Sequence, residues 1–157
     1  MTSTRINQID DIIASLDEII AAPDATLVGA AQQLAGELLG RGETILEIWL
    51  SAHDVTPTKN KFEGFRLLAL QRQGARGDAT FNACRETCRE LVYHRNLVCG
   101  EPAHADTARR LRLGAMVARH LALFIGGKLE VAGLGEFCCS SRTLRQDEAK
   151  ALAAPIT

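Results

Sequence analysis

The sequence predicts an all-α protein, a single-domain helical bundle of about six helices with a glycine-rich C-terminal appendage. Apolar residues recur at steps of three and four along most of the chain, which is the period of amphipathic helices. Glycine and proline interrupt this pattern about once per helix length. With 157 residues, 46% of them hydrophobic, the chain can bury one core without a disulfide or a structural metal. We expect the bundle to span residues 1–125, and the appendage, with a short terminal helix packed on the bundle, to span 126–157.

The first expected helix carries an apolar seam from Ile6 to Ile20 and ends near Pro23. The seam covers two heptads, fewer than a free-standing coiled coil needs, and the acidic residues lie mostly away from it. This helix must therefore pack on another helix. We predict a homo-oligomer in which it packs across subunits, with a partner protein as the alternative.

Glycine, proline and capping residues delimit the next three helices. The second begins near Asp24 and ends at the glycines of residues 40–42, and the third occupies residues 43–52. The fourth begins after Pro57 and runs to about Gly74. Each has an apolar stripe that we expect to face the core.

Two longer helices follow. One is expected over residues 79–99, capped by Asp78 and stopped by Gly100. The other is expected over residues 106–125, and because it is apolar on more than one face, it should be the most central helix. Beyond it, residues 128–131 alternate like a very short strand within the glycine-rich appendage.

Four of the five cysteines form the most concentrated chemical group in the sequence. Cys84 and Cys88 are four residues apart, so their thiols lie one turn apart on the same side of a helix. Thiolates at this spacing can share a soft transition metal such as Zn, Cu or an Fe–S cluster, with Cys138 and Cys139 of the appendage as further ligands. The spacings match no strong zinc signature. One alternative is that Cys84 and Cys88 are ordinary core residues. Another is that the adjacent residues Cys138 and Cys139 form a reversible oxidation site.

Motifs of the common enzyme classes are absent from the sequence. Its glycines form no phosphate-binding loop, and it lacks both the G-x-S-x-G of serine hydrolases and the H-E-x-x-H of zinc proteases. His94 shares a helix face with two glutamates and is expected to be solvated, whereas His120 lies among apolar residues and is expected in the core. No convergent catalytic set emerges, so we expect a non-catalytic protein.

The net charge of −1 conceals two oppositely charged segments. Residues 1–55 carry two basic and nine acidic side chains, whereas residues 56–119 carry twelve basic and six acidic ones. We expect the two segments to face each other, within one chain or across a dimer. The alternative is a nucleic-acid surface in the basic middle segment, but acids alternate with bases there and the turn glycines do not fit a helix-turn-helix.

These patterns favour a non-catalytic α-helical module for association or assembly, acting through self-association or a partner protein. One alternative is a thiol-based metal-binding or redox-sensing protein that uses the cysteines, and another is a DNA-binding regulator. No apolar run approaches the roughly 20 residues of a membrane span, and the first residues lack a signal-peptide core. We expect a cytoplasmic protein, with neither a membrane nor nucleic acid as its partner.

Overall fold

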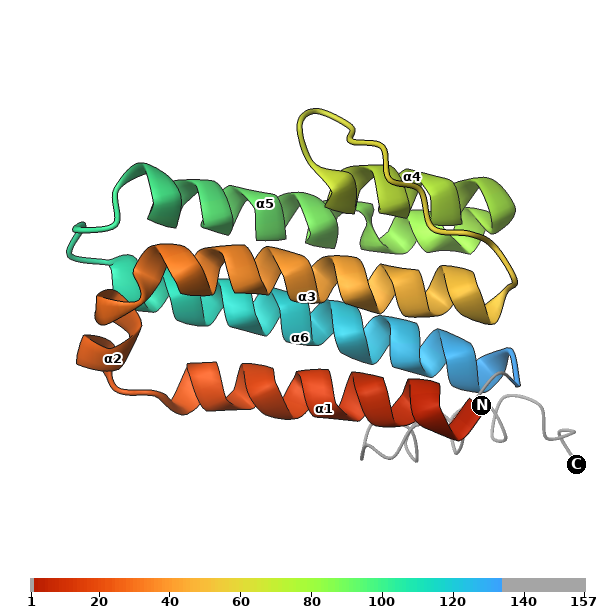
Figure 1. Cartoon of the computed structure of the whole chain (residues 1–157), viewed down its shortest axis with the longest axis horizontal. Coiled ribbons are helices and arrows are strands. Elements are labelled where there is room, and N and C mark those ends of the chain that lie inside the picture. The colour runs from red at the N-terminus through yellow and green to blue at the C-terminus, as the bar shows by residue number, and fades with distance from the viewer. Residues whose placement is uncertain (1, 134–157) are drawn as a thin grey trace, which may run out of the picture.

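The computed structural model describes residues 2–133 and confirms an all-α bundle (Figure 1). Within this range no residue belongs to a β-strand, and none of the helices is long and apolar enough to cross a membrane. Six α-helices and one short 3-10 helix, η1, follow one another along the chain: α1 (Thr2–Ala21), α2 (Asp24–Gly29), α3 (Ala31–Ala52), α4 (Arg66–Gly77), η1 (Ala79–Cys84), α5 (Arg85–Gly100) and α6 (Thr107–Val131).

The helix α6 lies at the centre of the bundle and packs against α1, α3 and α5 (Figure 1). This confirms the expectation drawn from its apolar faces. Its buried side includes Ala115, Ala118 and Ala122, whose small side chains let the neighbouring helices approach closely. The shorter α4 packs on α3 and α5 at one end of the bundle (Figure 1).

From Ile9 to Ile19, the apolar seam of α1 packs against α6 of the same chain. Ile9, Leu16 and Ile19 are at most 8% exposed, and α1 contacts α6 far more extensively than it contacts α3. The prediction that this helix packs on another helix is therefore correct. Because the same chain covers the seam from Ile9 to Ile19, an uncovered α1 no longer supports the predicted homo-oligomer, which stays a prediction.

Two glycine-containing stretches predicted to end helices, at residues 40–42 and 126–127, lie inside helices instead, whereas Gly100 ends its helix as predicted. The helical structure is interrupted at Ala30, between α2 and α3, and α3 then continues without a break through residues 40–42. The predicted end of a helix at residues 40–42 is therefore wrong. A Cβ at Gly42 would lie 2.8 Å from Cδ2 of Leu91, which shows that this glycine lets α3 and α5 pack closely.

The helix α6 likewise continues through Gly126 and Gly127, both buried, to Val131. The strand predicted for residues 128–131 is therefore wrong, and the first part of the predicted appendage belongs to the last helix of the bundle. Residues 134–157 of the predicted appendage, with its predicted terminal helix, lie outside the described residues.

The segment before α4 is a tight turn rather than the helix start that the sequence predicts. Phe62 and Phe65 exchange two backbone hydrogen bonds of 3.0 Å, and α4 begins only at Arg66. Between them, Glu63 and Gly64 adopt φ values of 52° and 86°, as the two central residues of a type I′ turn require.

Ion pairs join the acidic first segment to the basic middle segment within one chain, as the charge pattern predicts. Arg66 of α4 pairs with Glu43 and Glu47 of α3, at 3.4 and 2.6 Å. On α6, Arg112 and Arg119 pair with acidic residues of the first 24 positions. These contacts neutralise part of the basic segment, and among the described residues its other basic side chains have no such partner in the acidic first segment.

Candidate functional site

The two predicted helical cysteines lie in the core. Cys84 and Cys88 are 2% and 0% exposed, and the Cys84 thiol donates a hydrogen bond of 3.1 Å to the Phe81 carbonyl oxygen. Hydrogen bonding to Cys84 and burial raise the pKa of Cys88 well above its ordinary value, so its thiol stays protonated. Residues 2–133 contain no group of three or more His, Cys, Asp or Glu side chains that could hold a metal ion.

The other two predicted ligands, Cys138 and Cys139, lie outside the described residues. A four-thiol site therefore stays a prediction, while the packing of Cys84 and Cys88 matches the core alternative.

The environments of the two histidines differ from those the sequence predicts. His120 is exposed rather than in the core. His94 is half-buried, its Nδ1 is buried without a hydrogen-bond partner, and burial lowers its pKa, an effect that Glu90 opposes. The prediction for His120 fails because the face of α6 that carries Ala115 and Ala118 is the one that packs into the core. Met116 and His120 lie on the other side of the helix and face outward.

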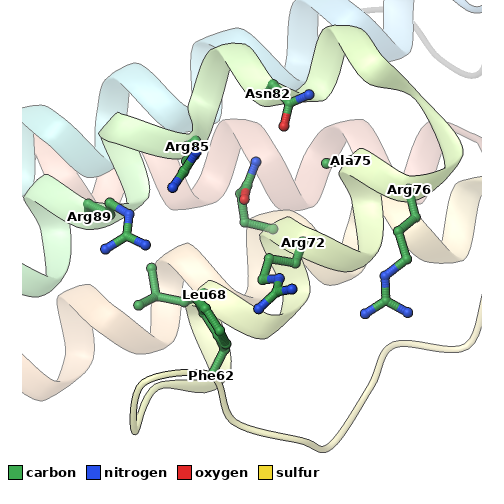
Figure 2. A pocket seen from close by; sticks show the side chains of 9 residues that line it. Phe62, Leu68, Arg72, Ala75, Arg76, Asn82, Arg85 and Arg89 are labelled. Carbon is green, nitrogen blue, oxygen red and sulfur yellow. The ribbon is translucent and has the colours of Figure 1, made fainter.

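The most distinctive site in the described structure is a cleft between α4 and the η1–α5 segment, with a volume of about 430 Å³ (Figure 2). Four arginines line it, and we call it the arginine cleft. In Figure 2, Arg85 and Arg89 project from α5, Arg72 and Arg76 from α4, and Phe62 lies at the rim. Its full lining consists of Phe62, Leu68, Gln71, Arg72, Ala75, Arg76, Asn82, Arg85 and Arg89.

Helical spacing and one chain reversal bring the four arginines together. Arg72 and Arg76 are four residues apart on α4, and Arg85 and Arg89 are four residues apart on α5, so each pair lies on one helix face. Between the helices, Asp78 caps η1 by accepting a hydrogen bond of 3.0 Å from the Thr80 amide. Because the chain reverses direction at this cap, the arginine pair of α4 and the arginine pair of α5 line opposite sides of the cleft.

Close packing between α4 and η1 fixes the spacing of the two sides. Gly74 lies on α4 where a Cβ would come within 2.5 Å of the Phe81 ring, so only glycine fits without movement. Phe81 is fully buried and stacks on Trp49, with ring centroids 5.6 Å apart. The buried ring therefore fixes how closely η1 approaches α4.

The interior of the cleft combines one oriented amide with apolar surface. Gln71 is 4% exposed and donates a hydrogen bond of 3.2 Å from Nε2 to the Phe81 carbonyl oxygen. This bond fixes the amide in one orientation at the base of the cleft. Leu68 and Ala75 add apolar surface, and the Arg72 guanidinium carbon lies 3.9 Å from the centroid of the Phe62 ring.

The cleft carries a local excess of positive charge. Arg89 forms an ion pair of 3.1 Å with Glu63. Among the described residues, no carboxylate lies within 4.0 Å of the guanidinium nitrogens of Arg72, Arg76 or Arg85. Three cationic guanidinium groups therefore line the cleft without an ion-pair partner among the described residues.

The chemistry of the guanidinium group suits this arrangement to an anion. The planar guanidinium presents paired N–H donors that match two oxygens of a phosphate or a carboxylate. In the sequence, the four arginines belong to the basic middle segment and were not predicted to form a site. The available signal was the repeat of R-x-x-x-R at residues 72–76 and 85–89, on two helices joined by a tight turn.

Comparison of the chain with protein-family models, with curated proteins and with solved structures finds no match to any of them.

Proposed function

We propose that this protein binds a small anionic ligand carrying two or more negative charges of the phosphate type in the arginine cleft. The observation that carries the proposal is the convergence on one cleft of Arg72, Arg76 and Arg85, none of which forms an ion pair with a described carboxylate. A multiply charged ligand fits because it can contact arginines of both helices at once.

The energetics of the free protein support the same conclusion. Like charges four residues apart on a helix destabilise it by a few tenths of a kcal/mol, and both arginine pairs have this spacing. A bound anion removes this repulsion and adds charge-assisted hydrogen bonds. The arrangement is therefore unfavourable for folding alone and favourable for binding.

The dimensions of the cleft favour a small molecule. Small-molecule sites usually have volumes of about 300–1,000 Å³ and combine apolar walls with a few oriented polar groups. The arginine cleft, at about 430 Å³, lies within that range, and the amide of Gln71 and the ring of Phe62 provide both kinds of surface.

Calorimetric titration with inorganic tripolyphosphate tests the proposal. We expect one saturable site per chain, with binding that weakens as salt concentration rises. Losing one charge-assisted contact should cost about 1–2 kcal/mol, so Arg72→Gln and Arg85→Gln should each raise Kd about 5–30-fold. Arg109→Gln is the matched control, because Arg109 is exposed in the first turn of α6 and lies outside the cleft. Absence of binding, or an equal loss in the control, would overturn the proposal.

A second candidate function is self-association through exposed apolar side chains on α5 and α6. Tyr93, Leu113 and Met116 are 59%, 38% and 50% exposed, and we call them the α5–α6 surface. A shallow hollow of about 370 Å³, lined by Leu113, Met116 and His94, lies between the two helices. Large exposed apolar side chains beside a hollow favour a protein contact.

Sedimentation equilibrium of the wild-type protein and of a Met116→Glu variant tests this second candidate. We expect a dimer at micromolar concentrations for the wild type and a monomer for the variant. A wild-type protein that stays monomeric at 100-fold higher concentration would refute it.

A further inference from the structure

We propose that Glu63 is a specificity-determining residue of the arginine cleft. Its carboxylate holds Arg89 at one end of the cleft, so an extended anion that reaches Arg89 must first displace this carboxylate, whereas a small anion bound by the other three arginines need not. The inference rests on the proposed function and names its ligand class: a linear oligophosphate or an organic compound with an oligophosphate chain.

The tight turn before α4 directs Glu63 toward α5. Two backbone hydrogen bonds of 3.0 Å close the turn between Phe62 and Phe65. Glu63 adopts a φ of 52°, a region that residues other than Gly, Asn and Asp seldom occupy. In this conformation its carboxylate reaches Arg89 across 26 positions of sequence, with a distance of 3.1 Å between Oε2 and Nη1.

Two cleft arginines hold the turn in place. Arg89 pairs with Glu63, and Arg72 lies over the ring of Phe62. Both contacts use groups that the proposed ligand would also bind. The turn and the ligand therefore compete for the same guanidinium groups.

The Glu63–Arg89 pair is weak enough for a ligand to exchange. The side chains of Arg89 and Glu63 are 36% and 51% exposed, and ion pairs at such exposure contribute little net stability. A tripolyphosphate that bridges the arginines of α4 and reaches Arg89 brings more charge than the carboxylate it displaces. A single phosphate, bound by Arg72, Arg76 and Arg85, leaves the pair intact.

Two substitutions and two ligands test this inference at 0.15 M salt, where interactions beyond about 8 Å are screened. We expect Glu63→Gln to lower the Kd for tripolyphosphate about 2–5-fold and to leave the Kd for inorganic phosphate unchanged. In an Arg89→Gln background the same substitution should give no gain, because the pair no longer exists. Glu18→Gln, at an exposed position of α1, is the control for the loss of one negative charge.

The possible results separate the inference from the function on which it rests. If Arg72→Gln weakens tripolyphosphate binding but Glu63→Gln has no effect, the inference is wrong and the proposed function stands. A gain that persists in the Arg89→Gln background, or that the control reproduces, also overturns the inference. If no variant and no wild-type sample binds tripolyphosphate, both are wrong.

Discussion

Replacement of Gly74 by alanine perturbs the contact that holds the two sides of the arginine cleft together. The new Cβ would lie 2.5 Å from Cε1 and 2.7 Å from Cδ1 of Phe81. An ordinary contact begins at 3.4 Å, so the ring or the backbone must move by about 0.9 Å. Phe81 is fully buried and stacks on Trp49, which leaves the ring no free space.

Overpacking costs about 1–3 kcal/mol, and an overlap of this size with a fully buried ring places the cost in the upper part of that range, about 2–3 kcal/mol. The better helix propensity of alanine returns about 1 kcal/mol. We therefore expect Gly74→Ala to lower the free energy of unfolding by about 1–2 kcal/mol and Tm by about 2–8 °C. Binding of tripolyphosphate should weaken too, because the Phe81 carbonyl oxygen holds the Gln71 amide at the base of the cleft. Urea unfolding and thermal unfolding, both followed by circular dichroism, measure the stability change.

The matched control is Gly36→Ala on the exposed side of α3, where a Cβ would meet nothing within 4 Å. It should raise stability by about 0.5–1 kcal/mol, since alanine is the better helix former. If Gly74→Ala is as stable as the wild type, or if both variants shift stability in the same direction, the packing argument is refuted.

Three further predictions concern titration and reactivity. Hydrogen bonds, those from Thr80 foremost, lower the pKa of Asp78 from 3.8 to about 2, so its stabilising effect is complete above pH 4 and is lost as the pH falls toward 2. An Asp78→Asn variant should lose less stability over that window in an acid titration followed by circular dichroism. Burial lowers the pKa of His94 below 6.5, so stability to urea should be greatest above pH 6.5 and should fall below it, with a smaller fall in His94→Leu. Iodoacetamide should modify Cys99 before Cys88 in the folded protein, and equal rates by peptide mass spectrometry would contradict the burial of Cys88.

Periodicity in the sequence was sufficient to predict the class of the fold and its central helix. The seam from Ile6 to Ile20 and the two-sided apolar pattern before Ile125 depend only on which residues are apolar, and both helices form where that pattern lies. Glycine was a poorer guide. An interior glycine costs a helix only about 1 kcal/mol, and at Gly42 the close packing against Leu91 outweighs that cost.

The arginine cleft was harder to predict because it depends on two segments meeting in space. The repeats at residues 72–76 and 85–89 are visible in the sequence, but their convergence requires the cap at Asp78 and the contact between Gly74 and Phe81. The position of Glu63 depends on a left-handed residue that is not glycine. The one indication in the sequence was the glycine that follows Glu63, because type I′ turns favour glycine at their second central position.

The most direct test of the account is an NMR titration that observes the arginine side chains of the 17.0 kDa protein while tripolyphosphate is added. We predict that the Nε–Hε resonances of Arg72, Arg76 and Arg85 shift together with one Kd, and that the resonance of Arg109 does not move. Shifts confined to arginines outside the cleft, or no shift at millimolar tripolyphosphate, would contradict the claim that this cleft is the binding site.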